Sequence, residues 1–228
     1  MGHALRSELL ITHDWDWTAA QREAELGVSL GKNNSFALYA AGDTATALGR
    51  WEQADTYLRQ ALAVDPLDAE PRDLFSWTLY HEGRFAEAEA EGRRVLEIRP
   101  SYALAHFDLG LYLLAQGKPQ AALSEMQLEP LEGFQVVGVA MALHALGRKG
   151  ESDAALSRAE HDFGQDTAFE IACAHAHRGE ATQAFQWLNR AFVQKDSLLE
   201  YVKGEWMLRN LESDPRYGAF LRKMNLPE

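Results

Sequence analysis

Histidine and cysteine are the side chains of this sequence with the widest scope for chemistry. The chain has eight histidines and one cysteine, and Cys173, His175 and His177 fall close together. A thiol beside an imidazole would suggest a nucleophile and its base. In a helix, however, residues i and i+2 point in nearly opposite directions, and a helical metal pair needs i, i+4 spacing with a further ligand. The spacing therefore indicates neither a catalytic pair nor a metal site.

The other polar residues give no catalytic pattern either. The remaining histidines fall on separate predicted helices without an accompanying set of carboxylates. No strand is predicted, so no glycine-rich phosphate loop follows one. Glu87, Glu89 and Glu91 alternate along a predicted helix and indicate a solvated outer face. We therefore predict a protein that is not an enzyme, with no cofactor and no metal.

The bulk composition excludes two classes of partner. The net charge of -12 argues against sequence-independent nucleic-acid binding, which requires clustered Lys and Arg. No apolar run approaches the roughly 20 residues that span a bilayer, so we expect no membrane insertion. A single cysteine excludes an intramolecular disulfide and favours a reducing compartment, so we expect a cytoplasmic location.

A repeat reveals the elements that must position these side chains. Small residues and prolines recur at an interval of about 34 residues, the length of a stacked helix–turn–helix unit. The recurring residues are Ala20, Ala54, Ala88 and Ala122, then Gly49, Gly83 and Gly117, then Pro66 and Pro100. Such a period predicts an array in which each helix pair contacts its neighbours and presents a curved surface.

The unit at 69–102 shows the logic of one repeat. Its first helix is predicted from Ala69 to Glu82, and Gly83 ends it in a left-handed conformation. Its second helix is predicted over 85–98 and stops before Pro100, because proline cannot continue a helix. Ala88 falls early in this second helix, where a larger side chain would push the two helix axes apart.

We therefore predict an all-α fold, a right-handed α-α superhelix of about six helix pairs with a C-terminal helical cap. The array covers 1–196, in approximate units 1–34, 35–68, 69–102, 103–132, 133–164 and 165–196, and the cap covers 197–228. Pro130 is expected to shorten the fourth second helix by about a turn. Asp214 and Pro215 indicate the start of a helix in the cap, which is needed to cover the packing face of the last repeat.

The repeat residues resemble the tetratricopeptide repeat (TPR) family. The matching pattern is Leu109-Gly110, Gly117 and Ala122, with Gly83, Ala88 and Pro100 in the preceding unit, and the resemblance covers about 1–196. Two further segments resemble a narrower bacterial group. They are Asp14-Trp15-Asp16-Trp17 with 19–23, and Leu208 to Tyr217 with Leu221 and Met224. In that group TPR regions follow adenylate-cyclase catalytic domains or winged-helix transcriptional regulators. The resemblance implies a regulatory or scaffolding module without activity.

In this family the first helix of each pair lines the concave face. Residues at i, i+4 and i+7 share one helical stripe, and these stripes predict an inner surface that is aromatic and aliphatic with few charges. The predicted groove residues are Tyr39, Asp43, Asp73, Trp77, Tyr80, Phe107, Leu111, Met141, His144 and Phe169. The stripes lack the Lys and Asn that clamp chaperone carboxylate tails in one TPR subgroup, so we predict no such clamp. An apolar groove suits a helix or an extended peptide, with Trp77, Tyr80 and Phe107 as anchors.

The predicted function is a non-enzymatic scaffold for protein–protein interaction that binds a protein or peptide partner in this groove. One alternative is a sensory or regulatory domain that binds a small apolar ligand and controls a separate effector domain. Two structural alternatives also stay open. An error of one residue in phase rotates each stripe by about 100° and would make Trp77 and Tyr80 core residues. The groove could also be filled from within, by the C-terminal segment or by self-association with a second copy.

Overall fold

The protein is described here by a computed structural model that covers residues 2–31 and 33–226, so residues 1, 32, 227 and 228 of the predicted ranges lie outside it. Every regular element in these ranges is a helix, which confirms the all-α prediction. One helix pair corresponds to each of the six predicted units. The pairs are α1 (Gly2–Leu9) with α2 (Trp17–Leu30), α3 (Ser35–Ala47) with α4 (Trp51–Val64), α5 (Ala69–His81) with α6 (Phe85–Ile98), α7 (Ala105–Ala115) with α8 (Pro119–Met126), α9 (Glu132–Ala145) with α10 (Lys149–Arg158), and α11 (Ala168–His177) with α12 (Ala181–Gln194). Helix α9 begins one residue before its predicted unit.

From the second pair to the sixth, a glycine makes the turn between the two helices, whereas Trp15 has the positive φ angle in the first pair. Gly49, Gly83 and Gly117 have φ angles of 71°, 83° and 70°, in the left-handed region that residues with a Cβ disfavour. The recurring alanines of the second helices, such as Ala88, are fully buried at the helix crossing. At another crossing a Cβ on Gly42 would lie 2.7 Å from Leu58 Cγ. Small side chains therefore let the helices approach closely, as the period predicts.

The fourth pair departs from the regular repeat. Its second helix, α8, has 8 residues, whereas α6 in the preceding pair has 14. Pro130 follows soon after α8, so the chain turns early into α9. The predicted shortening is therefore confirmed, and it is greater than the single turn expected. None of the helices in the described ranges is long and apolar enough to cross a bilayer.

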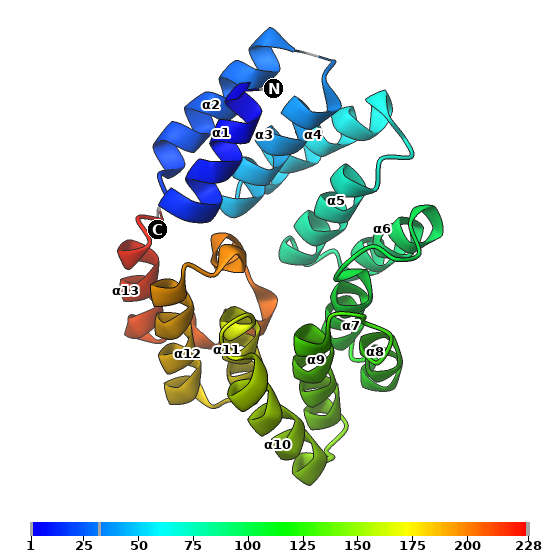
Figure 1. Cartoon of the computed structure of the whole chain (residues 1–228), viewed down its shortest axis with the longest axis vertical. Coiled ribbons are helices and arrows are strands. Elements are labelled where there is room, and N and C mark those ends of the chain that lie inside the picture. The colour runs from blue at the N-terminus through cyan, green and yellow to red at the C-terminus, as the bar shows by residue number, and fades with distance from the viewer. Residues whose placement is uncertain (1, 32, 227–228) are drawn as a thin grey trace.

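The two ends of the array meet. Trp17 Nε1 donates a hydrogen bond of 2.7 Å to the backbone oxygen of Met224, and the Trp15 and Phe192 rings lie 4.8 Å apart between centroids. Lys195 Nζ lies 3.9 Å from the centroid of the Trp15 ring. Asp16 caps α2, since its side chain accepts from the backbone N–H of Ala19. The two segments with the narrower bacterial resemblance thus meet in space and close the array into a ring (Figure 1).

The C-terminal segment enters the inside of this ring. It comprises the short helices η3 (Ser197–Tyr201) and η4 (Trp206–Leu211), followed by α13 (Pro215–Lys223). Asp214 caps α13 and Pro215 is its first residue, as predicted. Figure 1 shows the segment before α13 on the concave side of the curve, in orange. This segment therefore does more than cap the last repeat, because residues 197–211 occupy much of the groove.

Candidate functional site

A cavity of about 170 Å³ remains between the inner helices and the C-terminal segment. We call it the central pocket. Its walls come from α3, α5, α7, α9 and α11, and residues 198–207 close it. Six aromatic side chains line it, namely Tyr39, Trp77, Phe107, Phe134, Phe169 and Tyr201. Six carboxyl groups line it as well, namely Glu70, Asp73, Asp108, Glu170, Glu200 and Glu205.

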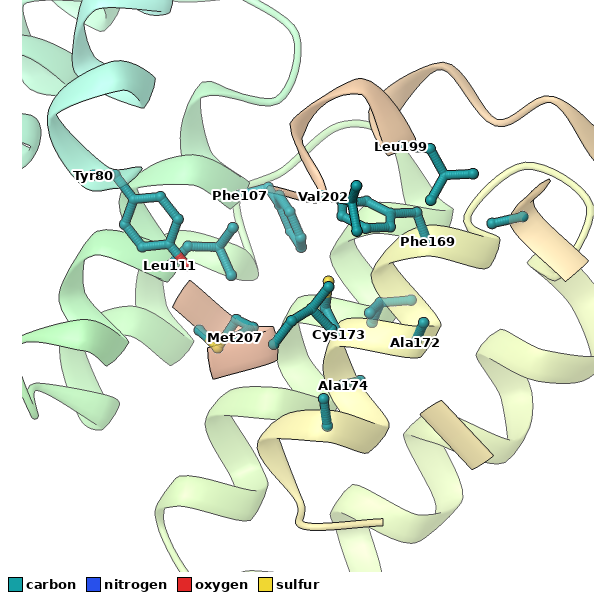
Figure 2. Packing of buried hydrophobic residues seen from close by; sticks show 14 of the residues in the cluster. Tyr80, Phe107, Leu111, Phe169, Ala172, Cys173, Ala174, Leu199, Val202 and Met207 are labelled. Atoms are coloured by element: carbon teal, nitrogen blue, oxygen red, sulfur yellow. The ribbon is translucent and has the colours of Figure 1, made fainter. Parts of the chain in front are cut away.

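Seven of the ten residues predicted for the groove line the central pocket together. They are Tyr39, Asp73, Trp77, Phe107, Leu111, Met141 and Phe169. Figure 2 shows side chains of α7, α11 and the C-terminal segment turned toward one another, among them Phe107, Phe169 and Met207. The stripe argument therefore has the right phase for these positions, and their role in binding stays a prediction.

The other three predicted groove residues lie outside the pocket. Tyr80 is fully buried, and its hydroxyl donates a 2.8 Å hydrogen bond to Glu205 Oε1. Asp43 is buried and accepts a 2.6 Å hydrogen bond from the Tyr201 hydroxyl. Tyr80 and Asp43 therefore hold the C-terminal segment rather than face an open groove, and Tyr80 is a core residue and no exposed anchor.

His144 also lies away from the pocket. Its ring contacts that of His177 edge to face, with 5.7 Å between centroids. Both histidines lie in the last turn of their helices, α9 and α11, and neither lines the pocket. His144 therefore packs between neighbouring units.

The sequence left open whether the C-terminal segment fills the groove, and in the structure residues 198–207 of that segment lie in it. The expectation of few charges is wrong, because acidic side chains stand beside the apolar ones on α5, α7 and α11. Asp108 follows Phe107, and Glu170 follows Phe169. The sequence prediction gave each helix a single stripe of inward-facing residues. In a pocket formed between several helices, residues next to that stripe also line the wall. An acid directly after a groove aromatic, in Phe107-Asp108 and Phe169-Glu170, was the signal available in the sequence.

Burial dominates the electrostatics of these acids. Withdrawal from water raises the pKa of Glu205 to about 7, and burial together with the nearby Glu70 charge raises the pKa of Asp73 to about 7. The pKa values of Asp108, Glu170 and Glu200 are also raised well above the ordinary range, first by burial and then by neighbouring carboxylates. Among the described residues that line the pocket none is basic, so this part of the wall offers no positive charge to offset the acids.

Two of the carboxyl groups have an oxygen with no hydrogen-bond partner within the described residues. These atoms are Glu170 Oε2 and Glu200 Oε2, on side chains whose residues are 4% and 5% exposed. Trp77 Nε1 is likewise buried without a partner there. Buried polar atoms in folded proteins nearly always have a partner, and each exception calls for an explanation. The pocket wall therefore contains two acceptors and one donor that have no partner among the described residues.

Cys173 and His175 have different surroundings in the structure. Cys173 faces the central pocket, and burial raises the pKa of its thiol, which keeps it protonated. His175 turns away, with Nδ1 2.7 Å from Glu180 Oε2 and Nε2 2.7 Å from Glu160 Oε1. In the part of the chain that the structure describes, no three His, Cys, Asp or Glu side chains are arranged to hold a metal ion.

Comparisons with known proteins identify the repeats. Residues 39–103 and 74–129 match the sequence model of the family described as Tetratricopeptide repeat. A curated relative, cellulose synthase operon protein C of Salmonella typhimurium (strain LT2), is 27% identical over 128 residues. The match covers 50% of this chain and 11% of that protein, so the chain spans a small part of this relative's length.

Solved structures share the fold. TTC0263, a thermophilic TPR protein in Thermus thermophilus, matches with a TM-score of 0.64 and 18% identity, over 80% of this chain and 97% of that chain. YrrB, described as a TPR protein with an unusual peptide-binding site, matches with a TM-score of 0.51 and 15% identity, over 88% of this chain and 97% of that chain. At these identities the likeness extends to the fold alone.

Proposed function

We propose that this chain is a tetratricopeptide-repeat scaffold without enzymatic activity and that its recognition site is the central pocket. The match of residues 39–129 to the sequence model of that family supports the proposal. The observation that carries the proposal is the convergence of inner side chains from α3, α5, α7, α9 and α11 on one pocket. Convergent walls with a few placed polar groups are typical of binding sites.

The size of the pocket limits what enters it. An engineered cavity of about 150 Å³ holds one benzene molecule, so a space of about 170 Å³ takes a small group. A helix has a diameter of about 10–12 Å with its side chains and does not fit. We therefore propose that a protein partner presents one side chain or a short chain end to the pocket, in place of the helix that an open groove would accept.

A second candidate function is ligand sensing. The contribution of the chain's own C-terminal segment to the pocket wall favours it, because a small molecule bound there would contact both the repeats and that segment. The resemblance of residues 14–23 and 208–217 to bacterial regions that follow cyclase or winged-helix domains supports this candidate. In it, a small ligand would change the ring closure and thereby a separate effector domain.

A pocket-filling substitution tests the proposed site. Leu111 is buried and lines the pocket, so Leu111→Trp places an indole side chain, which is larger than that of leucine, in the empty space. Leu128→Trp is the matched control, because Leu128 is 61% exposed and lies outside the pocket. Both variants are first compared with the parent chain by circular dichroism and thermal melting.

The readout is the set of proteins captured from the source lysate, together with the small molecules that raise the melting temperature in a screen. We expect Leu111→Trp to lose a partner or ligand that Leu128→Trp keeps. Loss of a captured protein supports the scaffold, and loss of a small-molecule effect alone supports the sensor. Identical behaviour of the two folded variants in both assays would exclude the central pocket as the recognition site.

A further inference from the structure

We propose that the central pocket binds a small organic cation that carries N–H donors, as a primary amine or a guanidinium group does. The inference rests on the proposed function, since it assigns the chemistry of the group that enters the same pocket. Its basis is the combination of buried, unbalanced carboxyl groups with an aromatic wall in one enclosed space.

The first step is the charge. Of the carboxyl groups in the pocket wall, Glu70 has an arginine partner, with Arg99 Nη1 at 3.1 Å from its Oε1. His81 Nε2 lies 4.0 Å from Glu205 Oε2, but burial lowers the pKa of His81 to about 4, so it is neutral near pH 7. The charges that raise the pKa of Asp108, after burial, are all those of other acids, namely Asp73, Glu129, Glu205 and Glu170. A positive group in the pocket would relieve this repulsion.

The second step is the pair of unpartnered oxygens. Glu170 comes from α11 and Glu200 from η3, so they approach the pocket from two separate elements. Each keeps an Oε2 atom that is buried and unpartnered in the described residues. Leaving such an atom unpaired is costly, whereas an N–H donor from a cation forms a short charge-assisted hydrogen bond with it. A ligand with N–H donors near Glu170 Oε2 and Glu200 Oε2 would therefore satisfy both oxygens.

The third step is the aromatic wall. Trp77 and Tyr201 meet edge to face with 6.0 Å between centroids, and Phe107 and Phe134 do the same at 5.5 Å. These four rings come from α5, α7, α9 and the C-terminal segment and border one space. A cation within about 6 Å of such ring centroids is attracted by their quadrupoles, most strongly by tryptophan.

The arrangement favours an organic cation over a metal ion. A metal ion gathers its ligands at one point, and no trio of acids in the described residues converges in that way. The carboxyl groups are instead spread around a cavity of about 170 Å³, which matches a ligand with several heavy atoms. A quaternary ammonium would use the rings and leave the oxygens of Glu170 and Glu200 unpaired, so N–H donors are preferred.

The same chemistry has two sources, a free small amine and the Lys or Arg side chain of a partner. The test uses 1,4-diaminobutane and agmatine as free cations, 1,4-butanediol as a neutral isostere, choline as a cation without N–H donors, and a short peptide with one lysine. Binding to the full chain is measured by calorimetry at pH 8. We expect the two amines to bind, choline to bind less tightly and the diol not to bind.

Variants assign the binding to the pocket. We expect Glu170→Gln to weaken amine binding by at least about tenfold, because it removes one charged acceptor. Glu97→Gln is the matched control, since Glu97 is exposed on α6 and lies outside the pocket. Thermal melting of both variants shows that they are folded. Equal affinity of the two variants for the amines would overturn the proposal.

The pH dependence gives an independent readout. A bound cation favours the ionised carboxylates, so binding releases protons from groups with raised pKa values, and affinity should rise between about pH 6 and pH 8. The titratable and charged groups beside these acids come from several elements. They are Glu70 with its partner Arg99, Tyr102 near Asp73, Glu129 near Asp108, Asp43 and Glu8 near Glu200, Asp196 near Glu170, and Tyr80 and His81 near Glu205. An affinity that falls over this range contradicts the inference.

The outcomes separate this inference from the proposed function. Binding of the lysine peptide without binding of free amines supports the cation chemistry and assigns it to a partner side chain. Binding of the diol as tight as that of the diamine, or binding of Mg²⁺ or Ca²⁺ with no amine, overturns the inference. If no cation binds while Leu111→Trp still loses a partner that Leu128→Trp keeps, the inference fails and the proposed function stands.

Discussion

Glu205 offers the sharpest test of the electrostatic reasoning, through the stability of the unliganded protein. Its side chain is buried, and Oε1 accepts hydrogen bonds from the Tyr80 hydroxyl and from the backbone N–H of Met207. Burial raises its pKa from 4.5 to about 7. In Glu205→Gln the amide oxygen can keep both hydrogen bonds, while the charge that burial disfavours is removed.

The magnitude follows from linkage. Because the pKa is higher in the folded protein than in the unfolded chain, folding stability is fully present below about pH 4.5, falls as the pH rises to about 7 and is constant above. A difference of about 2.5 between the two pKa values lowers the free energy of unfolding by roughly 3 kcal/mol at pH 8 and by under about 1 kcal/mol at pH 5. Hydrogen bonds to the neutral amide of the variant are weaker than those to the carboxylate, which reduces the expected gain in stability by about 1 kcal/mol.

We therefore expect Glu205→Gln to be more stable than the parent chain by roughly 2 kcal/mol at pH 8, with the gap closing near pH 5. Urea unfolding at the two pH values measures this, and Glu97→Gln serves as the matched surface control. A variant that is no more stable than the parent at pH 8, or a gap that does not depend on pH, would refute the assignment of a buried, unbalanced carboxylate. A gain in stability on removing an acid is also typical of residues retained for binding.

Three further predictions concern the frame that holds the pocket. Trp17→Phe removes the hydrogen bond to the Met224 oxygen and should lower the free energy of unfolding by about 1 kcal/mol, measured by urea titration, and an unchanged value would show that this contact does not close the ring. Asp16→Ala removes the N-cap of α2 and should cost about 1 kcal/mol in the same titration, whereas Asp16→Asn should cost little. Gly83→Ala places a Cβ at a φ of 83° and should lower the melting temperature with a cost of about 1 kcal/mol or more, although no neighbouring atom lies near the added carbon. A melting temperature equal to that of the parent would contradict the left-handed turn.

Most of the helical frame was predictable because its determinants are local. A left-handed glycine, a proline after the second helix and an alanine at the crossing act within one unit of about 34 residues. The predicted second helix over 85–98 agrees with α6, and Asp214 and Pro215 start α13 as expected. These features depend on neighbours along the chain, so spacing alone was enough to place them.

The binding surface was predictable only in part. The phase of the first helices brought seven groove residues to one pocket, because the same face of each helix points inward. The acids were missed, since whether Asp108 and Glu170 face solvent or a shared cavity depends on the spacing between neighbouring helices. Tyr80 was misassigned for the same reason, because its partner Glu205 lies 125 residues away along the chain.

By itself the sequence determined an all-helical repeat array with aromatic side chains on its inner face, since helix periodicity and small residues at crossings act over a few turns. Only the tertiary structure decided that the array closes into a ring and encloses acids. The contacts responsible join Tyr201 to Asp43 across 158 residues and Trp17 to Met224 across 207. No periodic signal marks such pairs, because they depend on the summed curvature of all the units between them.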